Sequence, residues 1–146
     1  MGKASRAIIL RGDNILFMYR HKEGAEYYTL VGGRLKEGET AEQGLVREVK
    51  EETGLDISAA RLVFIEKHPE PYNEQYIYLC ETSNHNEVAI QSTSEEAMLN
   101  KLKFNTHEPL WTHINLFSRL HFRTPQLQTA ITKAIAEGFP SEPLYI

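Results

Sequence analysis

The chain has 146 residues, of which 41% are hydrophobic and 25% are charged. This length and composition are typical of one globular domain, so we expect a single domain over residues 1–146. Twenty acidic residues against sixteen Lys and Arg give a net charge of −4, which argues against long nucleic acid as the main partner. The sequence holds no apolar run near the roughly 18 to 20 residues of a membrane span, and its one cysteine, Cys80, fits a reducing cytoplasm. We therefore expect a cytoplasmic protein that does not act on a membrane.

The N-terminal part of the chain predicts β structure. Two apolar runs, Ser5–Leu10 and Ile15–Tyr19, flank the turn sequence Arg11-Gly12-Asp13-Asn14 and indicate a β-hairpin. Glu26–Val31 is a third, short strand. We expect the pair Gly32-Gly33 to end it, because glycine pairs commonly mark turns and loops.

After this point the pattern mixes helices with strands. Thr40 is a suitable N-cap for a helix from Ala41 to about Thr53, and Gly54 follows its end. The remaining pattern predicts strands at Arg61–Lys67, Gln75–Thr82 and Pro109–His113, with a short extra strand at Glu87–Gln91. It also predicts a short helix over Ser94–Lys103 and a second helix that starts at Thr124-Pro125 and ends at Gly138. Strands and helices mixed without strict alternation indicate an α/β chain around a mixed sheet.

The helix predicted after Thr40 carries three carboxylates on one arc. On a helical wheel Glu48, Glu51 and Glu52 lie together, and Glu48 and Glu52 border or overlap the apolar stripe. A salt-bridged surface helix explains Arg47 with Glu51 four residues later, but it does not explain Glu48 and Glu52. Clustered carboxylates at a partly buried site repel one another unless a cation joins them, and such oxygen ligands suit Mg²⁺ or Mn²⁺. Gly44 lies beside the carboxylates on the wheel, and of its two interpretations, room for a neighbour or tolerated variation, the second is favoured.

These residues belong to a longer pattern that resembles the Nudix box. That box is a glycine, five residues, Glu, seven residues, and then Arg-Glu-hydrophobic-any-Glu-Glu-any-Gly-hydrophobic. All nine specified positions agree: Gly33, Glu39, Arg47, Glu48, Val49, Glu51, Glu52, Gly54 and Leu55. The flanking segments Tyr28–Gly33 and Glu108–Trp111 also look like family segments, with Tyr28 where many members have Trp and Val31 where many have Pro.

The resemblance implies a Nudix-type three-layer α/β/α sandwich with a mixed β-sheet. It also implies Mg²⁺- or Mn²⁺-dependent hydrolysis of the diphosphate linkage in a nucleoside diphosphate linked to another moiety, with water attacking phosphorus. Such substrates include nucleoside triphosphates, dinucleoside polyphosphates and nucleotide sugars. Carried over by position, the resemblance implies that the metal ligands are Glu48, Glu51, Glu52 and the Gly32 carbonyl. It implies that Glu48 or Glu52 is the base that activates water. It also implies that Arg47 orients a glutamate and that Glu39 holds the loop to the helix.

Contacts to the substrate are predicted outside the helix. Arg20 ends the second predicted strand and can bind a phosphate with two hydrogen bonds, with His21 and Lys22 as less favoured helpers. An ordinary surface arginine is the alternative interpretation of Arg20. Gly33, together with Gly32, lets the backbone come close to a ligand.

Aromatic and acidic residues supply further candidates. Tyr28, Tyr72 and Tyr76 are candidates to stack on a base, although packing explains most tyrosines on strands, and we assign at most one, Tyr28, to substrate binding. Some family members draw a further glutamate from a loop before the last strand. The candidates for that role are Glu95, Glu96 and Glu108.

The main rival function is a non-catalytic Nudix-fold nucleotide-binding or sensor module. Such modules typically lose glutamates of the box, and here none is missing. Hydrolysis of a capped RNA end is disfavoured by the acidic charge. The expected partner is therefore a small nucleotide derivative, with no long nucleic acid and no membrane, bound by a monomer or homodimer. The substrate, the preferred metal and the identity of the base stay open.

Overall fold

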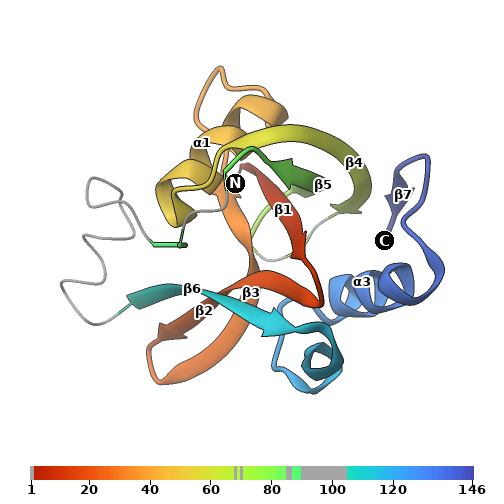
Figure 1. Cartoon of the computed structure of the whole chain (residues 1–146). Coiled ribbons are helices and arrows are strands. Elements are labelled where there is room, and N and C mark those ends of the chain that lie inside the picture. The colour runs from red at the N-terminus through yellow and green to blue at the C-terminus, as the bar shows by residue number, and fades with distance from the viewer. Residues whose placement is uncertain (1, 68, 70, 85–86, 90–104) are drawn as a thin grey trace.

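Seven strands form one mixed sheet, in the order β6-β2-β3-β1-β5-β4-β7 (Figure 1). The computed structural model describes residues 2–67, 69, 71–84, 87–89 and 105–146. β1 (Lys3–Arg11) and β2 (Asn14–Lys22) form the expected hairpin. The remaining strands are β3 (Ala25–Arg34), β4 (Ile57–Lys67), β5 (Glu74–Thr82), β6 (Asn105–His113) and β7 (Leu144–Tyr145). β1 runs parallel to β5 and antiparallel to β3, so the sheet is mixed as predicted.

β3 continues through the glycine pair, and the prediction that the pair ends this strand is wrong. Gly32 pairs with Arg6, and Gly33 pairs with Ser5 of β1, so the strand reaches Arg34. Gly32 has a φ of 134°, a conformation that other residues rarely adopt, and a Cβ there would lie 2.1 Å from the Ser5 carbonyl oxygen. The missing side chain therefore allows β3 to stay paired with β1 where a larger residue would push the strands apart.

Helices cover the sheet on both faces. They are α1 (Ala41–Thr53), the 3₁₀ helix η1 (Ile114–Arg119) and α3 (Pro125–Glu137). Val31 and Leu45 belong to the apolar cluster beneath α1, whereas Leu30 and Phe117 belong to the cluster beneath η1 and α3. Leu30 and Val31 are neighbours in β3, and successive side chains of a strand point to opposite faces. The two cores therefore lie on opposite faces of the sheet, which confirms the predicted α/β/α sandwich.

Some element boundaries differ from the prediction. β4 begins at Ile57 rather than Arg61, and β6 begins at Asn105 rather than Pro109. Their backbones pair with β5 and β2 beyond the apolar core, so the strands extend past the apolar pattern. Residues 87–89 form no strand, and the rest of the extra strand predicted at Glu87–Gln91 and the helix predicted at Ser94–Lys103 lie outside the described residues.

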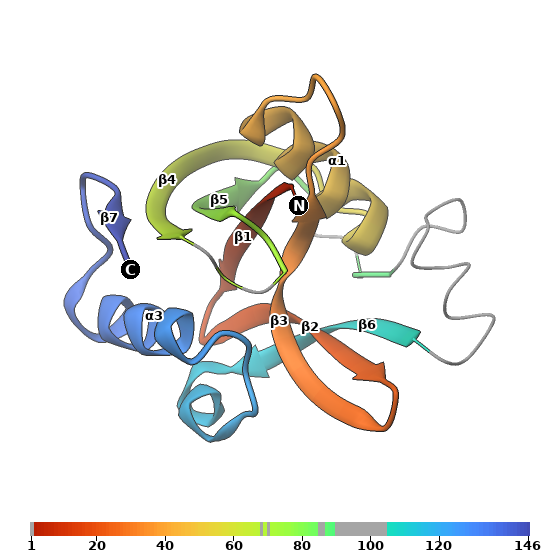
Figure 2. The ribbon, with the colours of Figure 1, turned by 180° about the vertical axis from the view of Figure 1, so that it is seen from behind.

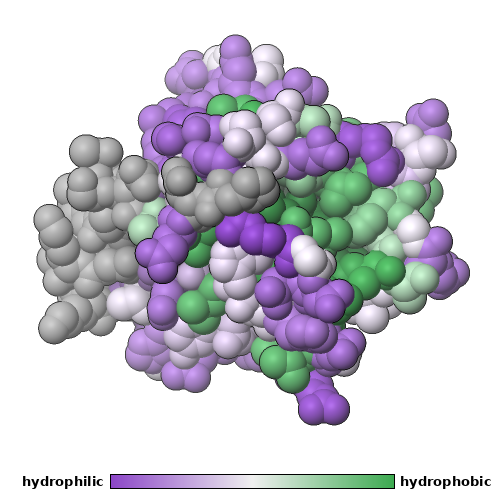
Figure 3. Space-filling view, in the orientation of Figure 1, coloured by the Kyte–Doolittle hydropathy of each residue, from purple (hydrophilic) through white to green (hydrophobic). Residues whose placement is uncertain are grey.

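The strands of the sheet differ in how close they lie to α1. Figures 1 and 2 show β2 and β6 at the end of the molecule away from α1, while β4 and β5 pass close to α1. Apolar side chains are exposed near α3 and β7, where Leu144 and Tyr145 lie on the surface (Figure 3).

In the described part of the chain, no helix has both the length and the apolar character needed to cross a membrane.

Candidate active site

The helix α1 begins and ends where the sequence predicts. The Thr40 hydroxyl accepts a hydrogen bond from the Gln43 amide, and the Gln43 side chain accepts one from the Thr40 amide, so two donors at the helix N-terminus are satisfied. Gly54 ends the helix with a φ of 79°. Burial of the apolar stripe turns Glu48 and Glu52 toward the sheet, where they are 7% and 3% exposed, as the helical wheel predicts.

The Arg47 guanidinium joins three carboxylates of this region. Its Nε and Nη2 donate to Glu39 at 2.7 and 3.0 Å, and its Nη1 donates to Glu48 at 3.0 Å and to Glu51 at 3.3 Å. Nη2 also donates to the Arg34 carbonyl at 3.2 Å. The hydrogen bonds from Arg47 lower the pKa of Glu39 to about 2, and the pKa of Arg47 is raised in turn. Arg47 therefore couples the end of β3 and the following loop to α1.

Glu48 and Glu52 both lie against the glycine pair of β3. Glu52 Oε1 accepts a hydrogen bond from the Gly32 amide at 2.6 Å. A Cβ on Gly33 would lie 2.9 Å from Glu48 Oε1, so a side chain at this position would displace the carboxylate. Two buried carboxylates of α1 and the backbone of β3 thus meet in one place.

Gly44 leaves room for side chains of the segment before α1, which is the less favoured of its two interpretations. A Cβ at Gly44 would lie 2.2 Å from Cδ2 of Leu35 and 3.1 Å from Oε1 of Glu39. Glycine inside a helix costs about 1 kcal/mol relative to alanine. An alanine here would require the Leu35 side chain to move.

The donor set has the chemistry that a divalent cation requires. Glu48, Glu51 and Glu52 supply carboxylate oxygens, which Mg²⁺ and Mn²⁺ prefer. In the conformation described, no three His, Cys, Asp or Glu side chains among the described residues converge into a metal-binding group. Glu48 and Glu51 accept from Arg47, and the Gly32 carbonyl accepts from Arg6 Nη1 at 2.9 Å. Metal binding here therefore requires the three carboxylates to move closer together than in the conformation described.

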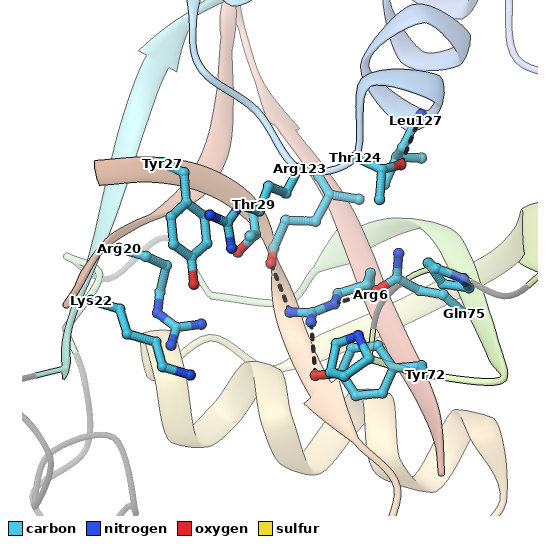
Figure 4. A pocket seen from close by; sticks show the side chains of 13 residues that line it. Arg6, Arg20, Lys22, Tyr27, Thr29, Tyr72, Gln75, Arg123, Thr124 and Leu127 are labelled. Carbon is cyan, nitrogen blue, oxygen red and sulfur yellow. Dashed lines mark hydrogen bonds between the residues drawn. The ribbon is translucent and has the colours of Figure 1, made fainter. Parts of the chain in front are cut away.

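A polar pocket of about 350 Å³ opens beside the glycine pair (Figure 4). Arg6 connects the two, because its Nη1 donates to the carbonyls of Leu30 at 3.2 Å and Gly32 at 2.9 Å. β1, β2, β3, β5, the segment before β5 and the start of α3 all contribute to the walls. The lining residues are Arg6, Arg20, Lys22, Tyr27, Thr29, Leu30, Pro69, Pro71, Tyr72, Gln75, Arg123, Thr124 and Leu127.

Buried polar side chains link this pocket to α3. Arg6 Nε donates to Gln75 at 2.9 Å, and the Gln75 amide donates to Glu66 at 3.0 Å. The Thr124 hydroxyl, at the N-cap of α3, donates to the other oxygen of Glu66. Burial raises the pKa of the Glu66 carboxyl. Because Arg6 also bonds to Gly32, one hydrogen-bonded chain runs from the start of α3 to the glycine pair.

The predicted substrate contacts divide into two groups. Arg20, Lys22 and Tyr72 line the pocket. Tyr28 does not, because its ring packs against those of Phe17 and Tyr19 at centroid distances of 6.4 and 5.2 Å. The structure thus places Tyr28 on the opposite face of β3 from its neighbour Tyr27, which lines the pocket.

The other candidates lie elsewhere. Gly33 contacts Glu48 and is not among the lining residues, and His21 and Glu108 are exposed on β2 and β6. Tyr76 donates to Glu74 at 2.9 Å, outside the pocket. Glu95 and Glu96 lie outside the described residues. Cys80 is buried, and burial raises the pKa of its thiol to about 12, so it suits a structural role.

Four pocket residues are not among those predicted from the sequence: Arg6, Tyr27, Gln75 and Arg123. Arg6 left a signal, because it is a charged residue next to the apolar run of β1, and a buried arginine requires partners. The other three residues left no such signal in the sequence. They come from segments that are distant in the sequence and meet only in the folded sheet.

Comparison with known proteins decides the family. The NUDIX domain family matches residues 1–123 of the chain. The chain belongs to the Nudix family. A Nudix relative named "NAD-capped RNA hydrolase NudC", from Vibrio atlanticus, is 47% identical over 57 residues, which are 37% of this chain and 20% of that protein. The dihydroneopterin triphosphate diphosphatase of Escherichia coli is 37% identical over 51 residues, which are 35% of this chain and 34% of that protein.

The chain therefore aligns with about a third or less of the length of these two curated relatives. Among solved structures, an ADP-ribose pyrophosphatase from Streptococcus suis has a TM-score of 0.69 and 23% sequence identity. That likeness covers 99% of this Nudix chain and 98% of the other chain. It shows that the two proteins share a fold.

Proposed function

We propose that this Nudix protein hydrolyses the diphosphate linkage of a small nucleotide derivative, with Mg²⁺ or Mn²⁺ bound by Glu48, Glu51 and Glu52. The observation that carries this proposal is the pair of buried carboxylates, Glu48 and Glu52, set against the Gly32-Gly33 backbone. Nudix hydrolases generally use divalent metal ions. Burying two neighbouring carboxylates costs desolvation and repulsion, which a bound cation would offset.

The residues of the box then have distinct roles. A bound divalent ion lowers the pKa of water and neutralises the charge of a diphosphate. Glu48 or Glu52 takes the proton of the attacking water, while Arg47 orients Glu48 and Glu39 fixes Arg47. The water oxygen bonds to phosphorus, and the bridging oxygen leaves with the electron pair of the broken bond. This chemistry depends mainly on positioning and on charge stabilisation, which a capped, rigid helix supplies.

We further propose that the rest of the substrate occupies the pocket beside Gly32. Arg6 contacts both the pocket and the Gly32 carbonyl, so a nucleotide in the pocket would present its diphosphate to α1. The whole chain acts as one Nudix domain, because α3 and β7, beyond residue 123, pack on the same sheet. The acidic net charge favours a small substrate over long RNA.

A product screen tests the proposal. The full chain is incubated with nucleoside triphosphates, dinucleoside polyphosphates, nucleotide sugars and dinucleotides, each with Mg²⁺, with Mn²⁺ and with a chelator, and phosphate-containing products are separated by chromatography. We expect turnover of at least one class, with none in chelator. Glu42→Gln serves as the matched control for Glu52→Gln, because Glu42 is an exposed glutamate of the same helix. Tight metal-dependent binding of a nucleotide without turnover of any compound would instead support a sensor.

A further inference from the structure

The pocket beside the glycine pair concentrates positive charge in an acidic protein. Arg6, Arg20, Lys22 and Arg123 all line it, whereas the chain as a whole has a net charge of −4. No carboxylate in the described part of the chain forms an ion pair with any of these four side chains. Glu66 and Glu52 act on Arg6 and Arg20 without forming an ion pair, and no described carboxylate pairs with Lys22 or Arg123.

Arg6 is committed to the protein itself. It donates to Gln75, to the carbonyls of Leu30 and Gly32, and to the Tyr72 hydroxyl at 3.3 Å. This set of bonds uses both terminal nitrogens and Nε. Arg6 is therefore a positioning residue of the pocket floor, and the other three cations are the ones with capacity for a ligand.

Arg20, Lys22 and Arg123 present donors toward the pocket. Arg20 makes one hydrogen bond, from Nη2 to Asn105 at 2.9 Å, and its buried Nε has no hydrogen-bond partner among the described residues. Lys22 and Arg123 are exposed and approach the pocket from β2 and from the segment before α3 (Figure 4). The Thr29 hydroxyl, also in the lining, is buried without a hydrogen-bond partner among the described residues. The pocket thus offers donors from separate elements.

Tyr27 organises two of these cations. The guanidinium carbon of Arg123 lies 3.7 Å from the centre of the Tyr27 ring, and that of Arg20 lies 5.7 Å from it. The negative face of an aromatic ring attracts a cation and partly offsets the repulsion between two guanidinium groups. Burial, with a contribution from Arg6, lowers the pKa of Arg20, which reflects the unfavourable setting of its charge. An anion placed among these side chains would relieve that cost.

We propose that Arg20, Lys22 and Arg123 form a second anion site, which binds a phosphate monoester of the substrate separate from the diphosphate that is cleaved. This inference rests on the proposed function for the position of the diphosphate. Guanidinium groups bind phosphate oxygens with paired hydrogen bonds, and Lys22 adds a point charge. The substrate class is therefore a nucleoside diphosphate derivative that carries an additional phosphate, such as one on a ribose hydroxyl.

Matched ligands that differ by one phosphate test this site. Adenosine 5′-monophosphate is compared with adenosine 2′,5′-bisphosphate and adenosine 3′,5′-bisphosphate by calorimetric titration of the full chain with Mg²⁺ present. We expect at least one bisphosphate to bind ten or more times more tightly, a difference of about 1.4 kcal/mol. Turnover is then compared within the pairs ADP-ribose and ADP-ribose 2′-phosphate, and dephospho-coenzyme A and coenzyme A.

Substitutions in the pocket test which residues cause the preference for the bisphosphate. In the double variant Lys22→Gln/Arg123→Gln we expect the preference for the bisphosphate to fall below threefold. Lys133→Gln, an exposed cation of α3 outside the pocket lining, is the matched control and should keep the preference. Both changed positions are exposed, and unchanged melting temperatures would show that the fold is retained.

The outcomes separate this inference from the proposed function. Equal affinity for the mono- and bisphosphates would overturn the second anion site, even if diphosphate compounds are hydrolysed. A preference that survives in Lys22→Gln/Arg123→Gln would also overturn it. A preference that is lost in the double variant, without turnover of any diphosphate compound, would support the anion site and reject the proposed hydrolysis.

Discussion

The inner face of α1 and the pocket beside β3 carry opposite charge. On α1, one arginine, Arg47, bonds to the carboxylates of Glu39, Glu48 and Glu51. In the pocket, four cations have no ion pair with a described carboxylate. The acidic face is suited to a cation and the pocket to an anion. A metal-bound, phosphate-rich nucleotide would supply both.

Arg6 and Gly32 form the junction between these regions. The Gly32 amide donates to Glu52 and the Gly32 carbonyl accepts from Arg6, so one peptide segment contacts both the acidic and the cationic site. The backbone of β3 therefore fixes the relative position of the two regions. Changes at this segment should therefore have the largest effects.

The substitution Gly32→Ala should disrupt the junction between the acidic face of α1 and the cationic pocket. The new Cβ would lie 2.1 Å from the Ser5 carbonyl oxygen, and a backbone atom in a sheet cannot move aside easily. We expect the free energy of unfolding to fall by more than about 3 kcal/mol, in the range of severe core changes. Urea denaturation measures it. Gly38→Ala is the control, because Gly38 has a φ of 80° with no neighbour within 4 Å among the described atoms, and it should lose roughly 1 to 2 kcal/mol. Equal losses would contradict the close-packing argument.

A second test removes one charge from the acidic side. Glu52→Gln keeps the shape of a side chain that accepts from Gly32, but it removes the charge that a divalent ion requires. We expect kcat to fall at least 100-fold, about 2.7 kcal/mol of barrier, while circular dichroism stays unchanged. A variant that keeps more than about a tenth of kcat would lose under about 1.4 kcal/mol and would exclude Glu52 from catalysis.

A third test measures the metal directly. If Glu48, Glu51 and Glu52 bind Mg²⁺ or Mn²⁺, the ion should raise the melting temperature, because a ligand of the folded state stabilises it. At ten times its Kd the gain is about 1.4 kcal/mol. Scanning calorimetry should show no gain in Glu51→Gln/Glu52→Gln. If the double variant gained as much as the wild type, the ion would bind elsewhere.

The smallest expected effect concerns Glu39. Its pKa in the folded protein is about 2, against 4.5 ordinarily, because Arg47 bonds to it. A lowered pKa contributes stability that is present above pH 4.5 and is lost as the pH falls toward 2. Since solvent screens this partly exposed pair, we expect a contribution on the order of 1 kcal/mol. Denaturation at pH 6 and pH 3 should show a smaller pH dependence in Glu39→Gln than in the wild type, and an identical dependence would contradict the role of Arg47.

The acidic helix could be predicted from the sequence because its information is local. Thr40, Gly54 and the spacing of Glu48 and Glu52 fix the start, the end and the buried face of α1, and all three agree with the structure. The continuation of β3 through Gly32-Gly33 is harder to predict from the sequence. A glycine pair usually interrupts a strand, but here β1 pairs with both residues, and that pairing depends on contacts 26 to 28 residues away: Arg6 with Gly32 and Ser5 with Gly33.

The pocket could not be predicted in the same way. Tyr27 and Tyr28 are both tyrosines of one strand, and the choice between them depends on which face of β3 meets the core. Arg123 lies nearly a hundred residues from Tyr27 in the sequence but stacks on its ring. Short-range patterns carry no information on such contacts, so Arg20 and Lys22 were candidates only by their position at the end of β2.

The central claim is that water attacks phosphorus at the diphosphate, and an isotope experiment tests it most directly. The reaction is run in oxygen-18 water with Mg²⁺ or Mn²⁺, and the products are analysed by mass spectrometry. In the proposed mechanism, Glu48, Glu52 and the Gly32-Gly33 backbone hold a metal-bound diphosphate, so the attacked atom is phosphorus. We predict label in one phosphate-bearing product and none in a sugar hydroxyl. Label in the sugar would contradict the mechanism.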